Sequence, residues 1–311
     1  MKRLLMICVA AVFVMALGNN VQAATWNVPG DFATIGDAMV DPQVEDGDTI
    51  LVGAGNHFGA YVTKGVEIKG ENGAVIDDGP LHPAGLTMGF RLLAGSDGAT
   101  ISHLSFTVDL AIMNGDGVDS VTVENCTFTN AIQAVSNWRG SGWLISHNII
   151  TDLRTACGGG IGILIADFSG GTVIGNVVSH NKISGTLHVA EGDCGGYAGS
   201  GIVLYADFRG TRTGAEEISG NSVVKNKVSL VSDTPAVVDV VAFELTDTRD
   251  DKILGPDTIF GNTIGFNDFR GTAEQIALTP ENLDTVNDIS RNLGDNRGHG
   301  LHPSVFGAGG I

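Results

Sequence analysis

Acidic side chains recur at a constant interval in the middle of this 311-residue chain. Asp167, Asp207 and Asp247 stand 40 residues apart, and Asn137 has the corresponding place one repeat earlier. If the repeat stacks these positions on adjacent coils, neighbouring carboxylates lie roughly 5 Å apart and next-nearest ones about 10 Å. Two carboxylates about 5 Å apart suit a retaining glycosidase, whereas a separation of about 7 to 9 Å suits an inverting one.

Cations and one aromatic side chain accompany this acidic row. Arg139, Arg209 and Arg249 each follow a row position by two residues, and Trp138 precedes Arg139. A polysaccharide lyase requires a base near the acidic carbon of a uronate and a cation, Ca²⁺ or arginine, beside its carboxylate. The row therefore fits hydrolysis and β-elimination alike. The catalytic candidates are Asp167, Asp207, Asp247, Arg209 and Arg249, and the substrate-binding candidates are Asn137, Trp138 and Arg139.

A structural interpretation of the same row stays open. Each aspartate can cap its own turn and pair with an arginine of the adjacent coil, without any ligand. Strand alternation would give Asp167 the inward direction of Ile163 and Ile165, where unpaired carboxylates are prohibitively costly. We therefore expect the chain to turn near residue 166 and to display the row at the edge between strand and turn.

Short β-strands must position these residues. The segment 162–168 recurs at 202–208 and more faintly at 242–248, with apolar residues alternating in each copy. Strands of this length cannot bury a face alone, whereas coils stacked about 4.8 Å apart build a continuous apolar interior. The sequence therefore predicts an all-β fold, a parallel β-helix solenoid.

A Gly-Asn block follows each of these strands. Asn176, Asn221 and Asn262 share one phase, and a second Asn stands five positions after each. An amide side chain both donates and accepts hydrogen bonds, so stacked Asn residues can bond to each other and to the turn backbone. We expect this row to be a structural ladder and not part of a catalytic site.

Motifs near the N-terminus carry a resemblance to a known superfamily. They are Asp31 to Ile35, Gly47-Asp48-Thr49-Ile50 and Val66 to Gly70, together with the Gly-Asn blocks. From about Trp26 to Arg270 the chain resembles the secreted right-handed parallel β-helix superfamily, the pectate-lyase-like fold. The resemblance implies a short N-terminal helix, at residues 34–40, that covers the first coil. The catalytic motifs of polygalacturonases and pectin methylesterases are missing.

The two ends of the chain differ from the repeat region. Residues 1–23 have a basic start, an apolar run and small residues before Ala23, which predicts a signal peptide cleaved after Ala23. The β-helix domain then covers residues 24–270, with an N-terminal cap at about 24–46. Residues 271–311 lose the repeat, so we expect a C-terminal cap and tail, with a weak helix over Ala273–Asp288. The mature chain has no segment long enough to span a membrane.

Composition limits the partners and cofactors. The formal net charge is −18, which repels phosphate backbones, so nucleic acid is not an expected partner. In an exported protein Cys157 and Cys194 can form a disulfide between adjacent coils, and Cys126 is expected to be a buried free thiol. No zinc motif is present, and Ca²⁺ is the one cofactor that the acidic row allows.

Two functions from different classes fit these observations. The first is a secreted or periplasmic β-helix that binds an extracellular polysaccharide on a lateral face and cleaves it as a lyase or glycoside hydrolase. The second is a non-catalytic surface or periplasmic scaffold or adhesin, whose polar rows are only turn chemistry. An assay against neutral and uronic polysaccharides, with and without Ca²⁺, separates the two.

Overall fold

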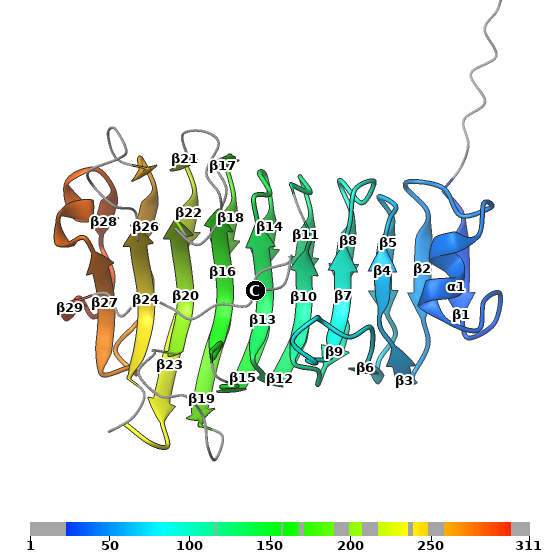
Figure 1. The fold of residues 1–311 in the computed structure, drawn as a ribbon, viewed down its shortest axis with the longest axis horizontal. Coiled ribbons are helices and arrows are strands. Elements are labelled where there is room, and N and C mark those ends of the chain that lie inside the picture. Colours follow the sequence, from blue (N-terminus) through cyan, green and yellow to red (C-terminus); the bar gives the residue numbers. More distant parts are fainter. Residues whose placement is uncertain are drawn as a thin grey trace, which may run out of the picture.

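Stacked parallel strands make up more than half of the described chain. The computed structural model describes residues 23–115, 117–156, 158–167, 171–189, 199–206, 217–235, 239–247 and 258–299. In this part of the chain the strands form four parallel sheets that run along one axis (Figure 1). The fold is an all-β parallel β-helix solenoid, as the repeat predicts.

Two large sheets form the first two sides of the coils. In spatial order, the ten-stranded sheet contains β1 (Thr25–Val28), β2 (Thr49–Val52), β5 (Glu67–Gly70), β8 (Thr100–Ser102), β11 (Thr122–Glu124), β14 (Leu144–Ser146), β18 (Val177–Ser179), β22 (Ser222–Val224), β26 (Thr263–Gly265) and β28 (Asp288–Ser290). The seven-stranded sheet contains β3 (Gly55–Phe58), β6 (Ala74–Asp78), β9 (Ser105–Phe106), β12 (Thr127–Ala131), β15 (Ile149–Arg154), β19 (Lys182–His188) and β23 (Lys227–Ser232).

The third side is a nine-stranded sheet, and a small sheet extends the later coils. The nine-stranded sheet contains β4 (Ala60–Val62), β7 (Met88–Leu92), β10 (Leu110–Asn114), β13 (Gln133–Trp138), β16 (Ile161–Asp167), β20 (Gly199–Ala206), β24 (Val240–Asp247), β27 (Glu274–Thr279) and β29 (Arg297–His299). The three-stranded sheet contains β17 (Thr172–Ile174), β21 (Glu217–Ser219) and β25 (Ile259–Phe260).

Apolar rows perpendicular to the strands fill the interior. In the ten-stranded sheet Ile68, Ile101 and Val123 pair in register on successive strands, and all three are completely buried. In the seven-stranded sheet the rings of Phe106 and Phe128 stack with centroids 5.0 Å apart. Since burying one such side chain contributes about 1.5 to 3 kcal/mol, these rows are the main stabilising feature of the solenoid.

The predicted N-terminal helix is present. Helix α1 (Ile35–Val40) is capped by Thr34, the residue before it. The Thr34 hydroxyl accepts a hydrogen bond from the Asp37 amide, and the Asp37 carboxylate accepts one from the Thr34 amide. This reciprocal capping fixes the start of the helix. Because Ile35 and Met39 are buried in the core, α1 covers the N-terminal end of the solenoid (Figure 1).

The predicted asparagine ladder is confirmed. The backbone amide and Nδ2 of Asn176 donate to Oδ1 of Asn221 at 3.0 and 2.9 Å, and Asn221 donates in the same way to Asn262. A second ladder follows the second Asn of each block and consists of Asn148, Asn181, Asn226, Asn267 and Asn292. Both ladders satisfy turn amides that are buried away from water.

The C-terminal region differs from the expectation. Instead of a weak helix over Ala273–Asp288, the chain forms β27, a 3₁₀ helix η1 (Glu281–Thr285) and β28, and the two strands extend existing parallel sheets. Asn287 and Asn292 also extend the two ladders. The coils therefore continue beyond residue 270, because these two asparagines keep the five-residue spacing of the earlier blocks. The predicted tail at 307–311 lies outside the described residues.

Candidate functional site

The described members of the predicted site lie on neighbouring strands of the nine-stranded sheet. Asn137 and Trp138 end β13, Asp167 ends β16, and Asp247 ends β24. Asp207, Arg209 and Arg249 lie outside the described residues, as do Cys157 and Cys194, and the roles assigned to them stay predictions.

The pairing register corrects the expected acidic row. Ala206 pairs with Asp167 on one side and with Asp247 on the other, so Asp207 comes one position later than the row requires. The equal sequence interval is misleading because the connections between successive strands differ in length by two residues. Asp167 and Asp247 are therefore separated by one intervening strand, which places them about 10 Å apart.

The expected exposure of the row is also wrong. Strand β16 ends at Asp167, close to the expected residue 166, but Asp167 exposes no surface and Asp247 is only 8% exposed. Nε of Arg139 lies 3.4 Å from Oδ1 of Asp167, and the Arg139 amide donates to the carbonyl of Ala166. The Asp167 carboxylate is thus buried beside an arginine of the adjacent coil. This arrangement agrees with the structural interpretation of the row, in which an aspartate pairs with an arginine without any ligand.

A glycine completes the surroundings of this ion pair. A Cβ added to Gly171 would lie 3.1 Å from Arg139 Nε and 3.6 Å from Asp167 Oδ2. No larger residue fits here without moving the guanidinium. Gly171, just before β17, therefore packs against the pair of Arg139 and Asp167.

The two other described candidates are buried and do not form an exposed sugar platform. Asn137 donates from Nδ2 to the Gly140 carbonyl at 2.9 Å and to Oδ1 of Asn176 at 3.1 Å, so its amide belongs to the first ladder. Trp138 has no exposed surface and packs in a cluster with Leu164 and Tyr205. The expected exposed Trp138 face is therefore not observed.

A carboxylate that the sequence interpretation missed lies on the outward side of the same sheet. Phe243 and Leu245 belong to the core, so Glu244 between them points outward, and yet it is completely buried. Its Oε2 accepts a hydrogen bond from the Ser200 hydroxyl at 2.8 Å, and its Oε1 accepts one from the Thr246 hydroxyl at 2.6 Å. Hydrogen bonds to a buried carboxylate are strong and offset part of its desolvation.

The sequence does contain a signal for this residue. Glu244 pairs in register with Val203, which pairs with Leu164, so a carboxylate replaces an apolar side chain in the corresponding place of the repeat. Such a costly replacement is typical of a functional position. Gln133 and Ser136 add a buried polar pair to the outward side, with a hydrogen bond of 2.7 Å between their side chains.

A cavity lies near the C-terminal end of the solenoid, between the end of β23 and the starts of β24, β27 and β29. The cavity has a volume of about 550 Å³, and its lining includes Asp239, Glu274 and Arg297 among apolar residues such as Leu230 and Val240. Glu274 is on β27, where it pairs with Val241 of the strand that carries Glu244. A cavity of this size accommodates a small saccharide.

The described residues contain no group of three or more His, Cys, Asp or Glu side chains arranged to hold a metal ion. In the same part of the chain no helix is long and apolar enough to cross a membrane. Comparisons with protein-family models, with curated proteins and with solved structures found no match to this chain.

Proposed function

We propose that this protein is a secreted β-helix of the pectate-lyase-like type that binds a neutral extracellular polysaccharide and hydrolyses it. The site is the outward side of the nine-stranded sheet, from Glu244 to the cavity beside Glu274. The observation that carries the proposal is the buried Glu244 carboxylate, held between the hydroxyls of Ser200 and Thr246 on a face where the repeat otherwise has apolar residues.

The charges of this region favour hydrolysis of a neutral chain. Glu244, Glu274 and Asp239 are acidic, and the arginine of the cavity lining, Arg297, already pairs with Asp284 and Asp295. A lyase must instead place a cation beside the carboxylate of a uronate. Two carboxyl groups that flank a glycosidic bond are the usual equipment of a glycoside hydrolase. Glu274 and Asp239, which line the cavity, are the proposed pair of catalytic carboxyl groups, and the buried Glu244 is proposed to hold strand β24 in place beside them.

The test measures products from a panel of neutral and uronic polysaccharides, with and without Ca²⁺. We expect reducing ends from a neutral polysaccharide, no unsaturated products and no requirement for Ca²⁺. Glu244→Gln should reduce the rate about 100-fold, because the amide cannot accept hydrogen bonds from both Ser200 and Thr246 and no longer fixes β24 beside the cavity. Unsaturated products would show that the reaction is β-elimination and not hydrolysis. A wild-type protein that is folded but inactive would favour a non-catalytic scaffold.

Glu217 provides a matched control. This glutamate on β21 accepts a hydrogen bond of 2.5 Å from Ser219, two residues later, as Glu244 does from Thr246. It belongs to the three-stranded sheet and not to the proposed site. Glu217→Gln should therefore keep the wild-type rate, and an equal loss in both variants would contradict the assignment of Glu244.

A further inference from the structure

A column of exposed side chains follows the turn between the ten-stranded and seven-stranded sheets. In the later coils its members are His147, His180, Lys225, Phe266 and Arg291, all exposed, with φ between 56° and 60°. The residue after each of them is an asparagine of the second ladder. Because the ladder fixes every turn in the same conformation, the column presents one side chain about every 4.8 Å along the axis.

This column and the strand starts beside it are cationic. Lys182 and Lys227 begin β19 and β23, pair in register, and are exposed next to the column. The rings of His147 and His180 stack with centroids 4.9 Å apart and planes 2° apart. We call His147, His180, Lys182, Lys225, Lys227 and Arg291 the basic strip.

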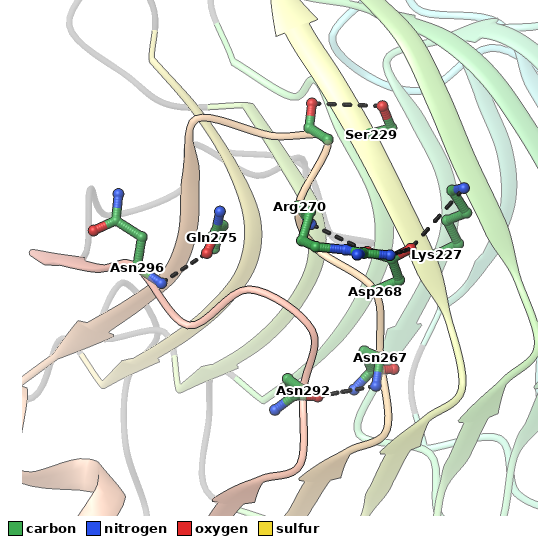
Figure 2. Close-up of polar contacts among 9 residues, drawn as sticks. Lys227, Ser229, Asn267, Asp268, Arg270, Gln275, Asn292 and Asn296 are labelled. Carbon is green, nitrogen blue, oxygen red and sulfur yellow. Dashed lines mark hydrogen bonds and ion pairs between the residues drawn. The ribbon is translucent and has the colours of Figure 1, made fainter.

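The nearest acidic side chain on the seven-stranded side of the strip is already paired. Asp268 accepts hydrogen bonds from Nε and Nη2 of Arg270 at 2.9 and 3.0 Å, and Nζ of Lys227 lies 4.0 Å from it (Figure 2). Arg270 thus offsets the charge of this carboxylate. On a chain with a formal net charge of −18, the basic strip is a local positive region.

Phe266 adds an aromatic surface within the column. Its side chain is 54% exposed, and the Arg291 guanidinium carbon lies 5.3 Å from the centre of its ring. A phenylalanine at a φ of 60° has a strained backbone. Because its side chain is exposed, hydrophobic burial does not offset this strain. Strained residues that structure alone does not require are typical of binding surfaces.

We propose that the basic strip binds a linear anionic polysaccharide, uronic or sulfated, that lies along the solenoid axis. The four lysine and arginine side chains of the strip, on three of its five coils, suit a chain that carries regularly spaced negative charges, and the face of Phe266 can stack on the apolar C–H face of a ring. Duplex nucleic acid and anionic membranes are broader and more densely charged, and the acidic remainder of the protein repels them. This surface is separate from the site around Glu244.

The test measures the Kd of the mature protein for polygalacturonate and for dextran sulfate at low salt, with neutral dextran as the reference. The triple variant Lys182→Glu/Lys225→Glu/Lys227→Glu should weaken binding of an anionic polymer about 100-fold, since three surface cations are reversed. Phe266→Ala should weaken it several-fold and leave the salt dependence unchanged. Lys69→Glu, three strands before β14 in the ten-stranded sheet and so outside the strip, is the matched control and should keep the wild-type Kd.

Three outcomes would overturn this proposal: no binding of either anionic polymer, an equal loss in Lys69→Glu, or tighter binding to duplex DNA or to phosphatidylserine vesicles. Circular dichroism and the midpoint of urea unfolding establish that each variant is folded. The two proposals fail separately. Glu244→Gln should leave the Kd for the anionic polymers unchanged, and the triple variant should keep the hydrolysis of a neutral polysaccharide.

Discussion

At the scale of single residues, the pair of Arg139 and Asp167 explains how a carboxylate is tolerated in the solenoid. Asp167 is completely buried, while the Arg139 side chain is 28% exposed and keeps part of its contact with water. Removing one partner of a buried ion pair leaves the other charge without compensation. The pair therefore has a structural role that does not require any ligand.

We predict that Asp167→Ala lowers the free energy of unfolding by about 2 kcal/mol, less than for a fully buried pair because Arg139 reaches solvent. Urea unfolding of the two single variants Asp167→Ala and Arg139→Ala and of the double variant measures the coupling. A double variant that is as unstable as the sum of the single variants would contradict a direct interaction.

Cys126 gives a prediction about alkaline pH. The thiol is free and buried, as the sequence predicts, and burial raises its pKa from 9.0 to about 12. The unfolded chain therefore loses this proton first, so its contribution to stability is complete below pH 9 and is lost as the pH rises toward 12. Between pH 9 and 10.5 wild-type unfolding free energy should fall by about 2 kcal/mol more than that of Cys126→Ala. Parallel curves for the two proteins would contradict this.

At the scale of elements, the ladders hold successive turns in register. Asn221 is buried, accepts two hydrogen bonds from Asn176, and donates to Asn262 and to the Val173 carbonyl. Asn292 accepts from Asn267 at the end of its ladder and is only half-buried (Figure 2). The two residues therefore allow the same substitution to be compared in the middle and at the end.

Asn221→Ala should lower the free energy of unfolding by about 3 kcal/mol, because it leaves buried amides of the neighbouring coils unsatisfied. Asn292→Ala should cost only about 1 kcal/mol, because Asn292 is itself half-buried and water can take the place of its side chain. The comparison is made by urea unfolding at neutral pH. Equal losses in the two variants would mean that the ladder does not depend on burial.

The element scale also shows what the sequence can and cannot predict. The Gly-Asn blocks and the alternation around Ile163 identify the coils, because turn amides and apolar rows need those residue types at those places. The register of Asp167, Ala206 and Asp247 was not predictable, because connections of unequal length shift one strand by one residue. Glu244 was not predicted, because it stands out only when the pairing register is known. The register shows that the corresponding residues of the two preceding strands in the sheet, Leu164 and Val203, are apolar.

At the scale of the whole molecule, the first residue after the proposed signal-peptide cleavage site forms part of the fold. The Ala24 amide and the Trp26 indole donate to the Asp48 carboxylate at 2.7 and 2.9 Å. Cleavage after Ala23 would make the Ala24 nitrogen an ammonium group at the same carboxylate. Maturation would thereby convert a hydrogen bond from a neutral amide into an ion pair between an ammonium group and the carboxylate, which is stronger.

This contact makes stability depend on acidic pH. Burial raises the pKa of Asp48, but hydrogen bonds from Glu45, Trp26 and Ala24 and the charge of Lys64 together lower it below 3.8. Its contribution is therefore present above pH 3.8 and is lost as the pH falls through the lowered value. Asp48→Asn should show a smaller loss of stability between pH 5 and about 2 than wild type. The same slope in both proteins, measured by urea unfolding, would contradict the assignment.

The charge of the whole molecule divides its surface into two proposed binding regions. The side around Glu244, Glu274 and Asp239 is acidic and suits hydroxyl-rich neutral sugars, while the basic strip suits an anionic chain. Both follow from stacking, because the solenoid converts one residue per coil into a row along the axis. A row of this kind matches a linear polymer better than a small compact ligand.

The most direct test of the proposed function is a crystal structure of Glu244→Gln with an oligosaccharide of the neutral polysaccharide that the wild-type protein degrades. We predict that a sugar ring lies in the cavity, with its glycosidic oxygen about 3 Å from the carboxylate of Glu274 or Asp239. An oligosaccharide that binds only elsewhere, with no sugar atom in contact with Glu274 or Asp239, would contradict the proposed site.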